Sequence, residues 1–218
     1  MRAEILATGT ELLTGGIVET NSVFLAAELL DIGIETAFKT VVADDEKDME
    51  EALRRALERV DVIVITGGLG PTEDDITRRV VARILRKRLV LHDDALRAVK
   101  AAFASRGKEY PGINDRQALI PVGARLLENT VGVAPGFVLL EGGKFIAVLP
   151  GVPAEMQSMF RNGLRPQLKE HCGGSMFFRR KVLHTFGISE SRVNELVQDM
   201  MKQKRPIVAL TAKETGVD

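Results

Sequence analysis

Apolar residues recur with helical spacing over residues 46–60, where they stand at offsets of 0, 3, 4, 7, 8 and 11 from Met49. This spacing puts them on one side of an amphipathic helix. Residues 62–65 follow at once as a continuous apolar run, which is typical of a strand buried on both faces of a sheet. The first part of the chain therefore predicts alternating elements, with strands at 2–8, 34–42 and 62–65 and helices at 21–30, 46–60 and 76–85. Asn21 is the expected N-cap of the first helix, and Gly33 its expected C-cap.

The second part of the chain adds a hairpin and further helices. Two apolar runs flank Gly142-Gly143, which predicts a β-hairpin with a tight turn. Pro153 stands where another helix is expected to begin, because its fixed φ suits a first helical position. The remaining expected elements are a helix at 93–106, a helical turn at 114–119, and strands at 124–127, 137–140 and 145–149.

Strands that alternate with helices at this spacing form βαβ units and a mostly parallel sheet. We therefore predict an α/β fold with three layers, α/β/α, for residues 1–172. Residues 173–218 are predicted to form a small α+β domain, with strands at 177–186 and 206–212 and a helix at 189–203. Such a small domain buries little surface by itself, and the chain ends in a pattern typical of a turn. We therefore expect these residues to come from a longer protein.

Composition narrows the class of protein. Among the 218 residues, 30 are basic and 30 are acidic, so no overall field favours nucleic acid or an anionic membrane. No apolar run approaches the roughly 18 residues that a membrane-spanning helix needs, and the N-terminal run is too short for a signal peptide. The single cysteine, Cys172, cannot form an intrachain disulfide, which is typical of a reducing compartment. We expect a cytoplasmic protein with no membrane or nucleic-acid partner.

A glycine-rich loop joins the apolar strand at 62–65 to the helix that follows it. Gly67, Gly68 and Gly70 let the backbone turn tightly and bring its N–H groups close to an anion. The next helix adds the positive end of its dipole, so the loop is expected to bind phosphate. It is neither a P-loop, because no Gly-Lys-Ser/Thr follows, nor the dinucleotide fingerprint, which needs a glycine where Glu73 stands.

Three acidic residues, Glu73, Asp74 and Asp75, end this loop, and they would repel phosphate unless a cation lay between them. Carboxylates, phosphate oxygens and water are the usual ligands of Mg²⁺, so a divalent cation is expected here. Asp75 has a second interpretation, a capping box with Thr72 as N-cap. Asp74 is free of that role and is the stronger candidate for a metal or catalytic function. The three histidines are far apart in sequence and show no ligand spacing.

Other loops are expected at the same edge of the sheet. Glu11 follows the first strand within Thr-Gly-Thr-Glu, and Asp44 and Asp45 follow the second, so at least one of these two is expected to face the cleft. Gly151 lies between the last apolar strand and the Pro153 helix. The alternatives are a solvated loop glutamate for Glu11 and a rigid connector for the turn at Gly151.

Six sequence blocks follow one another over residues 1–170: Ala7-Thr8-Gly9-Thr10-Glu11-Leu12-Leu13, Thr20-Asn21, Gly67 to Asp75, Asn114-Asp115-Arg116-Gln117-Ala118, Ala134-Pro135-Gly136-Phe137 and Leu149 to Met156. Together they resemble the CinA family of competence/damage-inducible proteins, and residues 176–218 resemble the small KH-like domain of the same proteins. The KH-like part lacks the Gly-x-x-Gly loop of RNA-binding KH domains, so no RNA binding is expected. Val133 stands where the family usually has threonine.

The resemblance implies a molybdopterin-binding-like fold and metal-dependent hydrolysis of ADP-ribose to AMP and ribose 5-phosphate. It implies a homodimer that uses Mg²⁺ or another divalent cation, with K⁺ as a further candidate. A nicotinamide mononucleotide deamidase domain usually follows in the family and is not expected within these residues. The candidate catalytic residues are Asp74, Glu11 and Asp44, and the candidate metal ligands are Asp74, Asp75 and Glu11. The candidate substrate-binding residues are Gly67, Gly68, Gly70, Thr72, Asn21, Asn114, Arg116, Gln117 and Gly151.

Two alternatives remain open at this stage. The same loop could hold a pterin phosphate in a domain of the molybdenum cofactor biosynthesis type. The domain could also be a dimerising scaffold for the deamidase, without catalysis of its own. A surface salt bridge is the alternative to a phosphate contact for Arg116.

Overall fold

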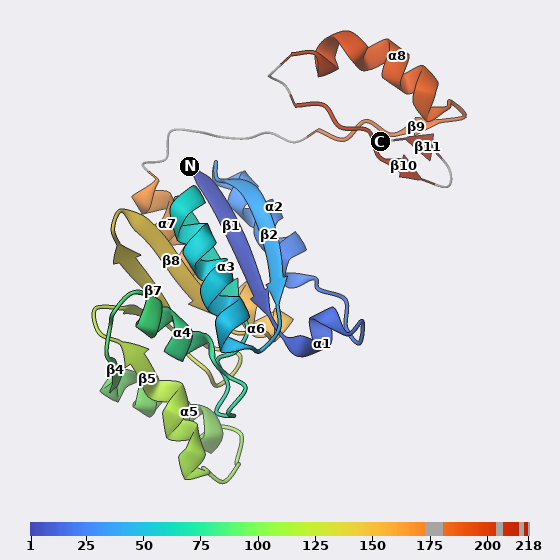
Figure 1. Ribbon diagram of the computed structural model, residues 1–218. Coiled ribbons are helices and arrows are strands. Elements are labelled where there is room, and N and C mark those ends of the chain that lie inside the picture. The colour runs from blue at the N-terminus through green and yellow to red at the C-terminus, as the bar shows by residue number, and fades with distance from the viewer. Residues whose placement is uncertain (173–180, 204–206, 214–215, 218) are drawn as a thin grey trace. The chain divides into compact units, whose positions relative to one another are not determined.

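The computed structural model describes residues 1–172, 181–203, 207–213 and 216–217 (Figure 1). The chain divides into two compact units, Met1–Phe178 and Arg179–Asp218. Each unit has its own sheet.

A six-stranded sheet forms the centre of the first unit, in the order β2-β1-β3-β8-β7-β6. The first four strands in this order are parallel, and β7 and β6 are antiparallel additions at one edge. The mostly parallel sheet predicted from the sequence is therefore confirmed. The strands are β1 Arg2–Thr8, β2 Glu35–Val42, β3 Val62–Thr66, β6 Arg125–Leu127, β7 Gly136–Glu141 and β8 Lys144–Leu149.

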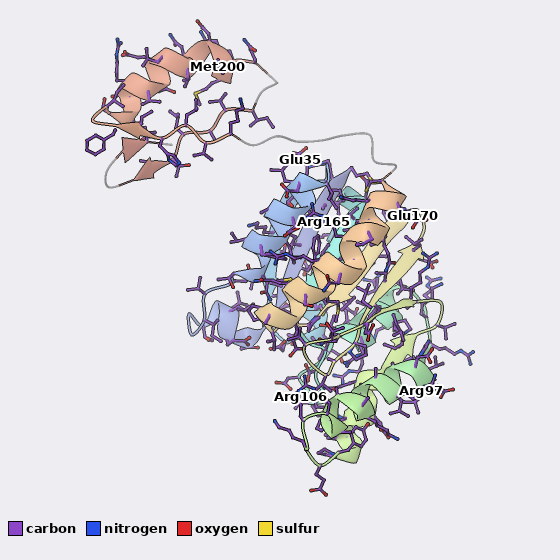
Figure 2. The ribbon with its side chains drawn as sticks, turned by 180° about the vertical axis from the view of Figure 1, so that it is seen from behind. Glu35, Arg97, Arg106, Arg165, Glu170 and Met200 are labelled. Atoms are coloured by element: carbon purple, nitrogen blue, oxygen red, sulfur yellow. The ribbon has the colours of Figure 1, made fainter. Side chains whose placement is uncertain are left out.

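Helices cover both faces of this sheet. On one face, α3 (Glu46–Arg59) and α4 (Thr77–Ile84) enclose an apolar cluster with the side chains that β3 and β7 present to it. The opposite face carries α2 (Asn21–Asp31) and the continuous run of helix from Pro153 to His171. Figure 2, drawn from behind, shows this run at its labelled Arg165 and Glu170. It consists of α6 Pro153–Met159, the π-helical turn η2 Phe160–Leu164 and α7 Arg165–His171. The three-layer α/β/α prediction is confirmed.

A smaller substructure projects from the first unit between α4 and β6. It contains α5 (Asp93–Ala104), the 3₁₀ helix η1 (Gly112–Ala118) and a two-stranded antiparallel sheet. This small sheet pairs β4 (Leu89–Leu91) with β5 (Leu119–Pro121) and was not predicted, because each strand is only three residues long and β4 is largely exposed.

Inside the main sheet, β1 carries a fully buried acidic residue, Glu4. Arg59, the last residue of α3, donates to both carboxylate oxygens at 2.8 and 2.6 Å, and the Thr40 hydroxyl donates at 2.7 Å. The Arg59 guanidinium also lies 3.7 Å from the centre of the Phe38 ring. These contacts tie α3 to β1 and β2, and the bond to Glu4 raises the pKa of Arg59.

In the described residues of the second unit, one helix is found with a small antiparallel sheet of order β10-β11-β9. The predicted helix is confirmed as α8 (Glu190–Met201), and the Ser189 side chain caps it by accepting from the Arg192 N–H at 3.3 Å. The sheet strands are β9 Thr185–Phe186, β10 Ala212–Lys213 and β11 Gly216–Val217.

The strands predicted in this unit differ from those found. Residues 173–180 and 204–206 lie outside the described part, and within the described part only 185–186 of the first predicted strand and 212 of the second are in strands. Gly216 and Val217 pair with β10 and β9, so the predicted terminal turn is a strand at these two positions. Short apolar stretches carry too little periodicity to fix such ends. None of the described helices is long and apolar enough to cross a bilayer.

Candidate functional site

A cleft of about 590 Å³ opens at the carboxyl edge of the parallel sheet, where β1, β3 and β8 end. Open α/β sheets place their ligands at this edge. Apolar residues line part of the cleft wall, namely Leu12, Ile17, Val18, Val133 and Val152. Its polar lining comprises Thr8, Glu11, Glu19, Thr20, Asn21, Asp44, Thr66, Asp74, Asp75, Gln117 and Glu155, together with Gly9, Gly67, Gly68, Gly70 and Gly151.

The glycine-rich loop at the end of β3 has a backbone that only glycine adopts easily. Gly67 has a φ of 109° and Gly68 a φ of 64°. A Cβ on Gly67 would collide with the Thr8 carbonyl oxygen, and a Cβ on Gly68 would collide with the Thr77 hydroxyl. The loop is therefore packed directly against β1 on one side and the start of α4 on the other.

Two of the loop amides are committed to the protein. The Gly67 N–H donates to the Leu149 carbonyl at 3.1 Å, and the Gly70 N–H donates to Asp75 Oδ1 at 2.6 Å. Within the described residues, the N–H groups of Gly68 and Leu69 have no hydrogen-bond partner, and both residues line the cleft. These two amides are the ones that the loop can offer to an anion, and substrate binding by Gly67, Gly68 and Gly70 stays a prediction.

Asp75 organises the acidic end of the loop. Besides the Gly70 N–H, it accepts from the Thr72 N–H at 2.9 Å and from the Thr72 hydroxyl at 2.6 Å. The capping box with Thr72 as N-cap is wrong, because α4 begins at Thr77 and its N-cap is Ile76. Both oxygens of Asp75 are already in use, while the metal-ligand role predicted for it, and the substrate contact predicted for Thr72, stay predictions.

Asp44 holds the loop after β1 in the same way as Asp75 holds the glycine-rich loop. Its carboxylate accepts from the Thr8 hydroxyl at 3.0 Å and from the Thr10 N–H at 2.8 Å. Asp45, its neighbour, is the N-cap of α3 and accepts from the N–H groups of Lys47 and Asp48. Of the two aspartates, Asp44 is the one that lines the cleft. Its predicted catalytic role stays a prediction.

Glu11 and Asp74 also line the cleft, and within the described residues neither carboxylate accepts from the backbone of a neighbouring loop as Asp44 and Asp75 do. Glu11 lies in the short helix α1 (Thr10–Leu13), and its carboxylate folds over Gly9, where a Cβ would stand 2.6 Å from Oε1. The Thr72 hydroxyl, followed by the backbone of Asp74 itself, lowers the pKa of the Asp74 carboxyl. Asp74 is therefore ionised at neutral pH.

Asn21 ties three cleft loops together. Its side-chain amide donates to Thr66 Oγ1 at 3.1 Å and to the Gly151 carbonyl at 2.7 Å, and the Thr66 hydroxyl donates to the Pro150 carbonyl at 2.9 Å. Asn21 is the first residue of α2 and not its N-cap, which is Thr20. A Cβ on Gly151 would come within 3.3 Å of the Gly67 Cα, so Gly151 lets these loops approach. Substrate contacts of Asn21 and Gly151 stay predictions.

The three polar residues of η1 separate in space. Gln117 is buried and lines the cleft, and its Oε1 has no partner within the described residues. Asn114 is also buried, and its amide donates to the Pro111 carbonyl at 2.9 Å. Arg116 forms an ion pair with Glu73 at 2.5 Å beside a smaller cavity of about 240 Å³. Of these three residues, only Gln117 lines the cleft. The substrate contacts predicted for all three stay predictions.

Glu155 and Arg78 are among the residues at or near the cleft that were not predicted. Glu155, in the first turn of α6, lines the cleft and accepts from the Asn129 side-chain amide at 2.6 Å. Its position just after the Pro150-Gly151 turn, which was expected at the same edge of the sheet, could have indicated that it lies near the cleft. Arg78, in the first turn of α4, is buried behind the glycine loop, and it looks like an ordinary helical surface arginine in the sequence.

The cleft offers few ligands to a metal. Over the described residues, no group of three or more His, Cys, Asp or Glu side chains is arranged to hold an ion. Mg²⁺ commonly takes one or two carboxylates and completes its shell with phosphate oxygens and water. Glu11 and Asp74 fit that kind of site, in which most ligands come from the substrate.

Fold and cleft together define a domain of the molybdopterin-binding type. Residues 4–170 match the family model described as "Probable molybdopterin binding domain", and residues 180–218 match the model of the damage-inducible protein CinA KH domain. The molybdopterin biosynthesis enzyme MoaB from Thermus thermophilus shares the fold, with a TM-score of 0.53 at 19% identity over 81% of this chain and 99% of that one.

The chain belongs to the CinA family. The crystal structure of CinA from Thermoplasma acidophilum, described there as of unknown function, matches with a TM-score of 0.70 and 35% identity. That match covers 78% of this chain and 99% of the other. A CinA-like protein of Dictyoglomus turgidum is 43% identical over 215 residues, which are 98% of this chain and 52% of that protein. The chain thus spans about half the length of the curated relatives it matches.

Proposed function

We propose that this domain hydrolyses the diphosphate of ADP-ribose to AMP and ribose 5-phosphate, with Mg²⁺ or another divalent cation. The observation that carries the proposal is the pair of unengaged amides of Gly68 and Leu69 at a cleft that the carboxylates of Glu11 and Asp74 also line. Amides stabilise a diphosphate, and carboxylates favour a cation bound to it. The cleft of about 590 Å³ is of the size that nucleotide-sized ligands need.

The amides of Gly68 and Leu69 are fixed before the substrate arrives, because neighbouring groups of the loop are held by Thr77 and Asp75. Such fixed donors stabilise the charge that develops on the phosphoryl oxygens without reorganising. When bound, a divalent cation would neutralise the diphosphate and lower the pKa of a coordinated water. The ionised Asp74 would orient that cation, and Glu11 is the candidate group to accept a proton from the attacking water.

Asp74→Asn keeps the size of the side chain and removes its charge. We expect this variant to lose Mg²⁺-dependent release of AMP from ADP-ribose by at least about 100-fold while melting at the wild-type temperature. Glu73→Gln is the matched control, because Glu73 is the neighbouring acid and pairs with Arg116 outside the cleft. Wild-type turnover in Asp74→Asn would falsify the proposed role of Asp74, and no AMP release from the wild-type protein would remove the proposed reaction.

A second candidate is pterin binding, which the description of the matching family model favours. The same amides could hold a pterin phosphate, and Gln117 could meet a pterin ring. Calorimetric titration with ADP-ribose and with molybdopterin separates the two candidates. Micromolar binding of ADP-ribose in the presence of Mg²⁺ supports hydrolysis, whereas binding of molybdopterin alone supports the second candidate.

The assembly is a separate proposal. Following the family resemblance, we propose a homodimer with a small-molecule nucleotide as its substrate, K⁺ as a further candidate ion, and no nucleic-acid partner. Sedimentation of the purified chain measures the oligomeric state directly. If the protein binds neither ADP-ribose nor molybdopterin and yet forms a dimer, the scaffold hypothesis is favoured.

A further inference from the structure

Arg78 is a buried cation that the chemistry proposed above does not use. It lies in the first turn of α4, only 4% of its surface is exposed, and it points behind the glycine loop toward the smaller cavity. Its guanidinium donates to the carbonyl oxygen of Leu69 and, at 3.2 Å, to that of Gly70. Burial lowers the pKa of Arg78 to about 10, and the charge of Asp75 opposes this shift.

The contacts of Arg78 and Asp75 act on one peptide group. In a trans peptide the carbonyl of one residue and the N–H of the next point in opposite directions and move as a rigid plane. Arg78 holds the Leu69 carbonyl, and Asp75 Oδ1 holds the Gly70 N–H at 2.6 Å. The plane that joins Leu69 to Gly70 is therefore clamped at both ends by opposite charges.

The preceding part of the loop is held in a similar way. The Thr77 hydroxyl donates to the Gly67 carbonyl at 2.9 Å, which turns the Gly68 N–H to the opposite side of that peptide plane. Thr77 and Arg78 are consecutive residues of α4, so the helix start holds the planes on both sides of the Gly68-Leu69 peptide. The Leu69 N–H, which has no partner within the described residues, lies between the two clamps.

We propose that Arg78 is a positioning residue that fixes the peptide planes following Leu69 and Gly70. Together with Thr77, it thereby holds the Gly68-Leu69 peptide between them, so that the Leu69 amide is presented to an anion in the cleft. Without the guanidinium, the Leu69 and Gly70 carbonyls lose their donors and can rotate toward the cleft. A carbonyl oxygen there would repel a phosphate. Arg78 acts through the loop and does not touch the ligand.

The test compares three substitutions in α4. Arg78→Met removes both hydrogen bonds and keeps a long side chain. Arg78→Lys retains the charge without the forked donors. Arg83→Met is the matched control, because Arg83 lies on the same helix, is half exposed and pairs with Glu46 and Glu50 instead of the loop.

The first measurement is hydrogen exchange of the backbone amides, which needs no ligand. We expect Arg78→Met to accelerate exchange of the Gly70 amide by about tenfold or more, with Arg78→Lys intermediate and Arg83→Met unchanged. Amides inside β3 should keep their wild-type protection. A uniform acceleration over the whole domain, or wild-type exchange at Gly70, overturns the proposal, because the first marks a merely structural role and the second no role.

The second measurement is the affinity for inorganic pyrophosphate by calorimetry, and it rests on the proposed function. Arg78→Met should bind about tenfold more weakly than wild type, with partial recovery in Arg78→Lys. Unchanged affinity in Arg78→Met contradicts the proposal. If the wild-type protein itself takes up no pyrophosphate, the proposed function fails and the exchange of Gly70 still decides the role of Arg78. If Arg78→Met does not fold, the exchange measurement on Arg78→Lys decides in the same way.

Discussion

At the scale of single residues, the cleft is shaped by backbone groups that neighbouring side chains hold in place. Thr77, Arg78 and Asp75 each bond to a peptide group of the glycine loop. Asp44 does the same for the loop after β1 through Thr8 and Thr10. Carboxylates that look alike in the sequence therefore divide into two kinds, those that build the loops and those that remain available to a ligand.

Gly68→Ala tests the steric part of this arrangement. Both Gly68 and Gly107 have a φ near +60°, but an added Cβ collides with the Thr77 hydroxyl at Gly68 and meets nothing within 4 Å at Gly107. We expect Gly107→Ala to lower the free energy of unfolding by about 1 kcal/mol, from backbone strain alone. Gly68→Ala should lower it by about 2–3 kcal/mol and weaken pyrophosphate binding, as measured by denaturant unfolding and calorimetry. Equal losses in the two variants would show that the contact with Thr77 carries no strain.

Tyr110 gives a prediction for alkaline pH. Its phenol donates to Asp115 at 2.6 Å, and burial together with this carboxylate raises its pKa from 10.0 to about 12. A raised pKa means that the folded state keeps the proton longer than the unfolded state. The resulting stability is fully present below pH 10.0 and is lost as the pH rises through about 12. The chain has one tyrosine and no tryptophan, so phenolate absorbance reports on Tyr110 alone.

Tyr110→Phe is the control for this effect. The difference in unfolding free energy between wild type and Tyr110→Phe should shrink between pH 10.0 and about 12, and the wild-type absorbance should titrate near the upper value. A phenolate transition at the ordinary pKa of 10.0 would contradict the raised value and the pH dependence built on it.

The sequence could place the glycine loop but not the partners of its residues. The loop follows an apolar strand and precedes a helical pattern, and both signals are local. By contrast, Arg116 and Gln117 are neighbours on a 3₁₀ helix, where adjacent side chains point in different directions. In the structure Gln117 lines the cleft and Arg116 pairs with Glu73, a difference that their neighbouring positions in the sequence do not predict.

At the scale of elements, α3 is joined to the sheet by a buried ion pair. Arg59→Met removes the cation beside the fully buried Glu4 carboxylate and leaves that charge without compensation. We expect a loss of about 2–3 kcal/mol in unfolding free energy, below the usual range because the Arg59 side chain is 35% exposed. Arg55→Met is the control, because its pair with Glu51 is largely exposed and should be worth under about 0.5 kcal/mol. Chemical unfolding of both variants checks the difference, and similar losses would mean that Glu4 needs no partner.

The elements that the sequence predicted best are those with long periodic patterns. The amphipathic helix α3 and the apolar strand β3 begin and end within one residue of the predicted ranges. The small β4–β5 sheet was missed because its two strands lie far apart in sequence and neither alternates for long enough to be distinguished from a loop. Its existence follows from tertiary packing, which a local pattern does not contain.

At the scale of the whole molecule, every residue that lines the cleft belongs to the first of the two units. The core clusters of that unit are complete without the second. A protein of residues 1–172 should therefore fold by itself, with one cooperative thermal transition and the pyrophosphate affinity of the full chain. Calorimetry measures both quantities. A broad transition, or a loss of affinity with a native melting curve, would show that the second unit contributes to the site.

The strand order has a consequence for how the chain folds. Strand β3 lies between β1 and β8, so one of its two neighbours precedes it in the chain, with Ala3 beside Val62, and the other follows it only at Phe145. During synthesis, the largely apolar strand β3 has one unpaired edge until the β7–β8 hairpin has left the ribosome. We expect the nascent chain to be prone to aggregation in this interval, and chaperones to bind it before residue 149 emerges.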